Sequence, residues 1–187
     1  MAGVFPIMQI NQVALIVRDL DDSLRQYWQT LGIGPWKVYT YGPPLVPRMT
    51  YRGKAQSYRM RLAFTQVGSL QLELIQPLVG ESIYQEHLDR HGEGMHHIGV
   101  FVASLDEAIS DATKNGYVVI QSGRGYGKWG DGGYAYLDTK ESLGTILELI
   151  EVPRERVPAE MEFPPSPELS PTRICTRTPS LRRTSSA

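Results

Sequence analysis

The sequence feature that most restricts the possible folds is an internal repeat that carries polar side chains inside apolar segments. Residues 11–17, Asn-Gln-Val-Ala-Leu-Ile-Val, match residues 96–102, His-His-Ile-Gly-Val-Phe-Val, when the chain is offset by 85 residues (97 − 12). The offset places Gln12 at the position of His97. Both segments have the composition of a buried strand, and a helical pattern follows each of them. Two related modules are therefore expected.

The repeat includes a second polar position near the end of each module. Residues 72–75 and 147–150 both read Leu-Glu-Leu-Ile, so that Glu73 and Glu148 lie within apolar runs. Burying an isolated carboxylate is costly unless the group is neutralised, paired or bound to a metal. Two such carboxylates, together with His97 and Gln12, therefore indicate a site for a cation.

Each module has the pattern strand, helix and three strands, which predicts an α+β fold of paired βαβββ modules. Such modules are too small to bury much core alone, so we expect them to pair into one cupped mixed sheet with helices outside. Pairing within the chain and pairing across a dimer both remain open. The predicted boundaries are an N-terminal extension (1–7), a first module (8–78), a linker helix (79–94), a second module (95–153) and a proline-rich disordered tail (154–187).

Local patterns add further expectations about individual segments. Asp19 to Leu31 is predicted as a helix that Gly32 ends. Residues 42–56, rich in proline and basic residues, are predicted as a surface loop, and the glycine-rich run 123–133 as a loop or lid. In the predicted strand 58–67, Met60, Leu62 and Phe64 line one face, and Arg59 and Arg61 lie on the other with Ala63 and Thr65.

Composition excludes several classes of function. The formal net charge of -1 gives no global attraction to nucleic acid or anionic membrane. The apolar runs are shorter than the roughly 20 residues of a transmembrane helix, and residues 1–6 lack the pattern of a secretory signal. The single cysteine, Cys175, fits a reducing compartment. We therefore expect a cytoplasmic protein without nucleic-acid or membrane partners.

Three segments carry a resemblance to a known family. They are residues 73–78 (Glu-Leu-Ile-Gln-Pro-Leu), residues 92–98 (Gly-Glu-Gly-Met-His-His-Ile) and residues 144–149 (Gly-Thr-Ile-Leu-Glu-Leu). They resemble the vicinal oxygen chelate superfamily, which includes glyoxalase I, methylmalonyl-CoA epimerase, extradiol dioxygenases and the fosfomycin or bleomycin resistance proteins. The likeness is closest to methylmalonyl-CoA epimerase-like proteins and covers roughly residues 8–153.

The resemblance implies that Gln12, Glu73, His97 and Glu148 bind a divalent metal. Epimerases usually have a histidine at the position of Gln12, and the set found here is similar to that of some glyoxalase I enzymes. Mixed nitrogen and oxygen ligands favour Zn, Ni, Co or Mn ahead of Fe(II). The implied activity is that of an isomerase, epimerase or lyase that transfers a proton next to a metal-bound carbonyl, with Glu148 and Glu73 as the catalytic bases.

The implied partner is a small carbonyl or thioester substrate, bound by a homodimer. Arg59 and Arg61 are candidates for holding a carboxylate or a CoA phosphate of this substrate. Tyr126 and Trp129, in the glycine-rich run, are candidates for a lid that also contacts the substrate.

Two other classes of function remain open. A ring-cleaving dioxygenase holds Fe(II) with two histidines and one carboxylate, and Gln12 occupies the place of one of those histidines. A non-enzymatic binding or resistance protein would use the cup without metal, and the four retained ligand-type residues argue against it. The metal content of the purified protein would separate the binding protein from the enzymes.

Overall fold

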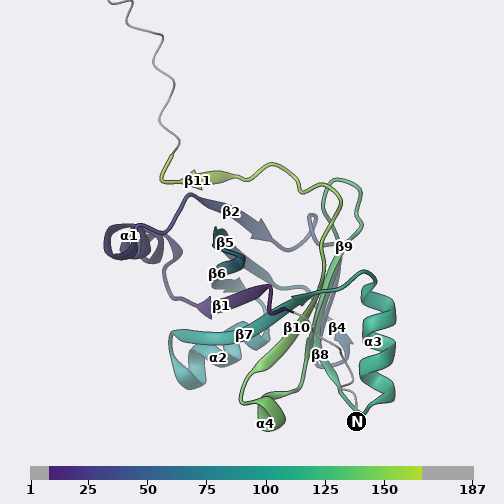
Figure 1. Cartoon of the computed structure of the whole chain (residues 1–187). Coiled ribbons are helices and arrows are strands. Elements are labelled where there is room, and N and C mark those ends of the chain that lie inside the picture. Colours follow the sequence, from purple (N-terminus) through teal and green to yellow (C-terminus); the bar gives the residue numbers. More distant parts are fainter. Residues whose placement is uncertain (1–8, 166–187) are drawn as a thin grey trace, which may run out of the picture.

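The computed structural model describes residues 9–165, which form one sheet with helices packed around it (Figure 1). The sheet has 11 strands in the order β11-β2-β5-β6-β1-β7-β10-β9-β8-β3-β4 and contains both parallel and antiparallel pairs. This confirms the predicted α+β class. The strands are β1 (Gln12–Ile16), β2 (Trp36–Tyr41), β3 (Arg48–Tyr51), β4 (Lys54–Ala55), β5 (Arg59–Val67), β6 (Leu70–Val79), β7 (Gly94–Phe101), β8 (Val119–Tyr126), β9 (Gly132–Leu137), β10 (Ile146–Glu151) and β11 (Met161–Phe163). The helices are α1 (Leu20–Leu31), α2 (Ile83–His91), α3 (Leu105–Lys114) and α4 (Lys140–Leu143).

The two halves of the sheet have the same arrangement of strands. In the first half β1 pairs in parallel with β6, and in the second half β7 pairs in parallel with β10. The halves join where β1 pairs antiparallel with β7. The pairing that the sequence left open therefore takes place within a single chain.

Capping residues position the helices on the sheet. Asp19 and Ser82 accept hydrogen bonds from backbone N–H groups in the first turns of α1 and α2, and Gly32 ends α1 in a left-handed conformation. Helix α1 packs on β5 and β6, and α3 packs on β9 and β10, on opposite sides of the molecule (Figure 1). Helix α2 instead contributes Ile83, Tyr84 and Leu88 to the core of the concave face.

Aromatic contacts between the two halves show that the sheet curves into a cup. The Tyr58 hydroxyl lies 3.1 Å from the Tyr134 hydroxyl, and the Tyr41 and Tyr126 rings have centroids 5.2 Å apart. Strand β3 of the first half also pairs with β8 of the second. The tyrosine contacts join segments from opposite sides of the strand order, so the concave face encloses a core.

Two segments predicted as loops contain strands, and the predictions were wrong for the residues in those strands. Residues 42–56 contain β3 and β4, and the glycine-rich run contributes the end of β8 and the start of β9. The reason is visible at Gly123, where a Cβ atom would lie 2.3 Å from the Tyr134 ring. The missing side chain lets a tyrosine pack directly on the strand, so glycine here permits pairing.

The prediction of a disordered tail was wrong for residues 154–165. Strand β11 pairs antiparallel with β2, and the Glu160 carboxylate accepts hydrogen bonds from the backbone and hydroxyl of Thr40. The edge of β2 has unpaired backbone N–H and C=O groups. These groups give the backbone of β11 hydrogen-bond partners, although its own proline-rich segment has no apolar periodicity that predicts a strand. The rest of the predicted tail, 166–187, and the whole predicted N-terminal extension, 1–7, lie outside the described residues.

Within residues 9–165, no helix has both the length and the apolar character needed to cross a membrane.

Candidate metal centre

Four neighbouring strands at the centre of the sheet each place one polar side chain on the concave face. The side chains are Gln12 on β1, Glu73 on β6, His97 on β7 and Glu148 on β10, and together we call them the polar cluster. Their exposed fractions are 4%, 8%, 0% and 4%. The structure therefore brings together the four residues that the internal repeat singled out.

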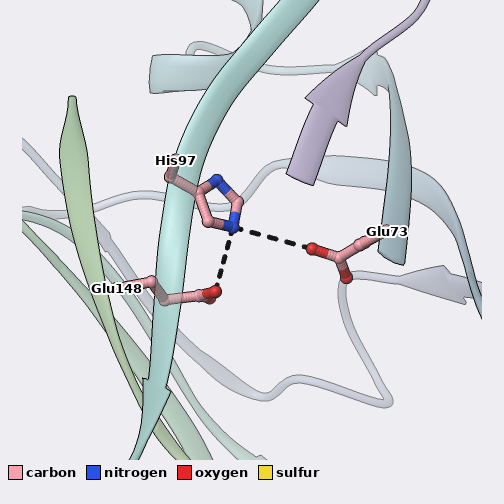
Figure 2. Close-up of side chains that lie close together, drawn as sticks. All are labelled: Glu73, His97 and Glu148. Atoms are coloured by element: carbon pink, nitrogen blue, oxygen red, sulfur yellow. Dashed lines mark ion pairs between the residues drawn. The ribbon is translucent and has the colours of Figure 1, made fainter. Parts of the chain in front are cut away.

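The distances in the polar cluster fit one small cation. One ligand atom each from Glu73, His97 and Glu148 lies within 4.8 Å of the other two. The Nε2 atom of His97 is 3.0 Å from the Glu148 carboxylate and 3.7 Å from the Glu73 carboxylate (Figure 2). Two carboxylate oxygens and one imidazole nitrogen at such distances suit a divalent transition metal.

Gln12 lies at the centre of the polar cluster. Its amide nitrogen donates hydrogen bonds to Glu73 at 2.8 Å and to Glu148 at 3.1 Å, and it lies 3.4 Å from His97 Nε2. An amide can rotate by half a turn to exchange its nitrogen and oxygen, and only the oxygen is a metal ligand. Gln12 can therefore hold the two carboxylates together through its nitrogen, or take part in a metal site through its oxygen.

Burial changes the acidity of all three titratable residues in the polar cluster. It raises the pKa of Glu148 to about 8 and raises the pKa of Glu73 well above its usual value, and the negative charge of Glu148 raises the Glu73 pKa further. Burial also lowers the pKa of His97 to about 3, so its imidazole is neutral at pH 7. A neutral imidazole can bind a metal as it is, whereas the two carboxyl groups must ionise first. A divalent cation between them would stabilise the ionised carboxylates that burial disfavours.

A second histidine orients His97. The Nδ1 atoms of His96 and His97 lie 2.9 Å apart, and both rings are buried. With a metal ion on Nε2 of His97, Nδ1 would carry the proton and donate a hydrogen bond to Nδ1 of His96. Such a second hydrogen bond fixes the tautomer and ring orientation of a metal-binding histidine.

Gly99 leaves the space that two members of the polar cluster occupy. It pairs with Gln12 on one side of β7 and with Glu148 on the other. A Cβ atom at this position would lie 2.9 Å from the Cβ of Gln12 and 3.4 Å from a Glu148 carboxylate oxygen. A side chain here would therefore push the polar cluster apart.

Gly99→Ala is accordingly expected to destabilise the fold by about 1–3 kcal/mol, the usual cost of overpacking, and to weaken metal binding. Thermal unfolding with and without added metal measures both effects. A variant that binds metal as tightly as the wild type would contradict the close packing described at this position.

Metal affinity should rise with pH up to about 8, because the carboxyl groups must lose their protons before they can bind an ion. Each proton released strengthens binding up to roughly tenfold per pH unit.

The raised pKa of Glu148 also affects the stability of the metal-free protein. Between the ordinary pKa of 4.5 and the folded-state pKa of about 8, the folded state holds a proton that the unfolded state has lost. The metal-free protein should therefore lose stability as the pH rises from about 4.5 to about 8. Metal titrations over this pH range test the predicted affinity, and melting curves of the metal-free protein test the predicted stability. A metal affinity that does not depend on pH would contradict the raised pKa values of the two carboxyl groups.

The other predicted site residues lie in different surroundings. Arg59 is exposed, and Arg61 forms a two-pronged ion pair with Asp21 of α1 at 2.9 Å, on the face of β5 opposite the cup. The structure does not bring either arginine to the polar cluster. Tyr126 is buried and lines the same cavity as Glu73 and Glu148, whereas Trp129 is 62% exposed and lies near Lys128.

Sequence reasoning missed several residues that line this inner cavity. The structure places Arg156 there, together with four tyrosines besides Tyr126: Tyr41, Tyr84, Tyr134 and Tyr136. The tyrosines alternate along β9 (Tyr134 and Tyr136), and that spacing could have placed both on one face. Arg156 had no such signal, because its segment was predicted to be disordered.

Comparison with known proteins identifies the family. A model of the glyoxalase/bleomycin resistance protein/dioxygenase superfamily matches residues 11–136, which contain β1 to β8, most of β9 and three members of the polar cluster. The chain belongs to this superfamily. An uncharacterised protein of Bacillus subtilis, YqjC, is 24% identical over 145 residues, covering 76% of this chain and 91% of the relative.

Solved structures of the superfamily share the fold at low identity. A hypothetical protein from Bacillus halodurans is 23% identical with a TM-score of 0.55, covering 80% of this chain and 97% of that one. Methylmalonyl-CoA epimerase from Mycobacterium tuberculosis is 21% identical with a TM-score of 0.55, at coverages of 82% and 94%. A variant of the Streptomyces coelicolor epimerase, in complex with 2-nitronate-propionyl-CoA, is 22% identical with a TM-score of 0.54, at 81% and 99%. The likeness establishes the arrangement of the sheet, and the reaction has to be inferred from the residues of the site.

Proposed function

We propose that the chain is a divalent-metal-dependent epimerase, isomerase or lyase that moves a proton at a carbon next to the carbonyl of a small ketone or thioester. The observation that carries this proposal is the buried convergence of Glu73, His97 and Glu148 on the concave face. Gln12 completes the proposed metal set. Zn, Ni, Co and Mn suit these donors ahead of Fe(II).

A bound divalent ion would supply a Lewis acid that lowers the energy of negative charge on the carbonyl oxygen. The carboxylates of Glu148 and Glu73 would then accept the proton from carbon and return it. A base works best when its pKa lies near the working pH, and burial raises the pKa of Glu148 to about 8. Glu73 comes from the other half of the sheet, so the two carboxylates face the inner cavity from different sides. This arrangement suits removal of a proton from one face of a carbon and return to the other.

The identity of residue 12 separates two reactions within this proposal. Gln12, in a glutamine-glutamate-histidine-glutamate set, favours a glyoxalase I-like lyase, whereas the fold neighbours with named activities given above are methylmalonyl-CoA epimerases. The ring-cleaving alternative is less well supported, because the carboxylate-imidazole group contains one histidine, His97, where such an iron site needs two. A metal-free binding protein would bury two carboxyl groups without an ion to favour their charged form, which burial disfavours.

Two measurements test the proposed function. Elemental analysis of freshly purified protein should find a divalent transition metal, and added metal should raise the melting temperature. Deuterium should enter acyl-CoA, 2-hydroxy-ketone or hemithioacetal substrates from D₂O when the metal-loaded enzyme is added. Protein that neither contains nor responds to metal would favour the binding-protein alternative. O₂ consumption with these compounds would favour the oxygenase.

A cytoplasmic homodimer, expected from the sequence, stays a prediction. All four residues of the polar cluster come from one chain, so the proposed metal set does not require a second copy.

A further inference from the structure

Arg156 reaches the concave face from the segment that connects β10 to β11. Its guanidinium lies over the Phe64 ring, 4.5 Å from the centroid, and its Nη1 donates a hydrogen bond to the Tyr41 hydroxyl at 3.3 Å. Phe64 of β5 is directly opposite Glu73 of β6 in the antiparallel register, so both side chains leave the sheet on the same face. The guanidinium therefore lies on the side of the sheet that carries the polar cluster.

Arg156 differs from the charged residues beside it in having no ion pair. Arg154 pairs with Asp131 at 2.7 Å, and Glu155 pairs with Lys128 at 2.9 Å. Across residues 9–165, by contrast, no carboxylate lies within ion-pair distance of the Arg156 guanidinium. Arg156 is partly buried, and its positive charge lowers the pKa of both Glu73 and Glu148. A guanidinium held in this way is available to an anion from outside the chain.

The charge balance of the inner cavity favours such an anion. Two carboxylates and one divalent ion cancel, and an imidazole that binds a metal is neutral, so Arg156 would leave the metal-loaded cavity with a net positive charge. The remaining lining consists mainly of apolar and tyrosine side chains, which screen charge poorly. A carboxylate on the substrate would restore neutrality and form charge-assisted hydrogen bonds with the guanidinium.

Arg156 also lies between two hollows of the protein. It lines both the inner cavity and an outer groove whose other residues include Lys37, Tyr39, Lys128 and Glu162. A substrate that reaches the polar cluster through this groove passes the guanidinium. An anionic group bound there would direct the rest of the molecule toward either the cluster or the groove.

We propose that Arg156 is a substrate-binding residue that selects carbonyl compounds carrying a carboxylate, which it holds at the junction of the inner cavity and the outer groove. The inference rests on the metal-dependent function proposed above and names its substrate class. It also gives the segment 152–163 a role, since strand β11 anchors the chain that carries Arg156.

Binding of two small acids to the metal-loaded protein tests this inference. Glycolate and tartronate offer a metal the same hydroxyl and carboxylate oxygens, but tartronate has one more carboxylate. Calorimetry should show that the wild type prefers tartronate by about tenfold or more, the usual value of a hydrogen bond between charged groups. Arg156→Gln should abolish this preference without changing the metal content, and Arg156→Lys should retain part of it.

Arg154→Gln is the matched control, because it removes a guanidinium two residues away that already has a carboxylate partner. The control should keep the full preference. An unchanged preference in folded Arg156→Gln, or a wild type with no preference, would overturn the inference. A protein that binds no metal but still prefers tartronate through Arg156 would support the anion site and remove only the metal-dependent function.

Discussion

Replacing His97 with alanine should remove the metal from the protein. The imidazole is fully buried and is the one nitrogen ligand in the carboxylate-imidazole group, so its loss leaves two carboxylates and an amide to hold the ion. Loss of a group that only orients a ligand already costs roughly 10–100-fold in affinity, and loss of a ligand should cost at least as much. Elemental analysis and metal titrations followed by melting temperature measure the effect.

His91→Ala is the control for this experiment. His91 is exposed at the end of α2, so its loss should leave the metal affinity unchanged. The melting temperature of metal-free His97→Ala shows whether the variant folds. A folded His97→Ala protein that retains the wild-type metal content would remove His97 from the site and, with it, the main support for the proposed reaction.

The internal repeat explains why the centre of the fold was predictable. Gln12 and His97 occupy equivalent strands, and the parallel partners of those strands place Glu73 opposite Ala14 and Glu148 opposite Gly99. A buried polar residue inside an apolar strand is costly and therefore informative, and four of them at repeated positions lead to one cluster. Helices α1, α2 and α3 were predictable for a similar local reason, since the side chain that caps each helix comes just before its first turn in the sequence.

The parts that were mispredicted depend on contacts between distant segments. Strand β11 forms only because β2 offers an edge, and no pattern within residues 154–165 indicates that partner. For Arg61, the alternation of side chains along β5 divided the strand into two faces, but it did not indicate which face lies inside the cup. Both faces are partly apolar, because Ala63 is buried beneath α1 while Leu62 lines the inner cavity. Arg61 therefore pairs with Asp21 outside, and Arg156, from an unpatterned segment, enters the cavity.

Glu148→Gln should retain much of the metal and lose most of the proton transfer. The amide has the shape of the carboxylate and keeps an oxygen that can bind an ion, but it cannot accept a proton from carbon. Glu148 is the better candidate for the base because it is 3.0 Å from His97, whereas Glu73 is 3.7 Å away, so an ion near the imidazole would hold Glu148 closest. Loss of a general base typically lowers the rate roughly 10²-fold or more.

Comparison of Glu148→Gln with Glu73→Gln assigns the base. Both variants remove one buried carboxylate from the same cluster, so they share any loss of metal affinity that comes from charge alone. Deuterium incorporation from D₂O, corrected for metal content, then reports proton transfer separately. If Glu148 is the base, its variant should exchange far more slowly than Glu73→Gln at equal metal occupancy. Undiminished exchange in Glu148→Gln would assign the base to Glu73, because the remaining ionisable group of the cluster, His97, has a pKa of about 3 and is too weak a base to take its place.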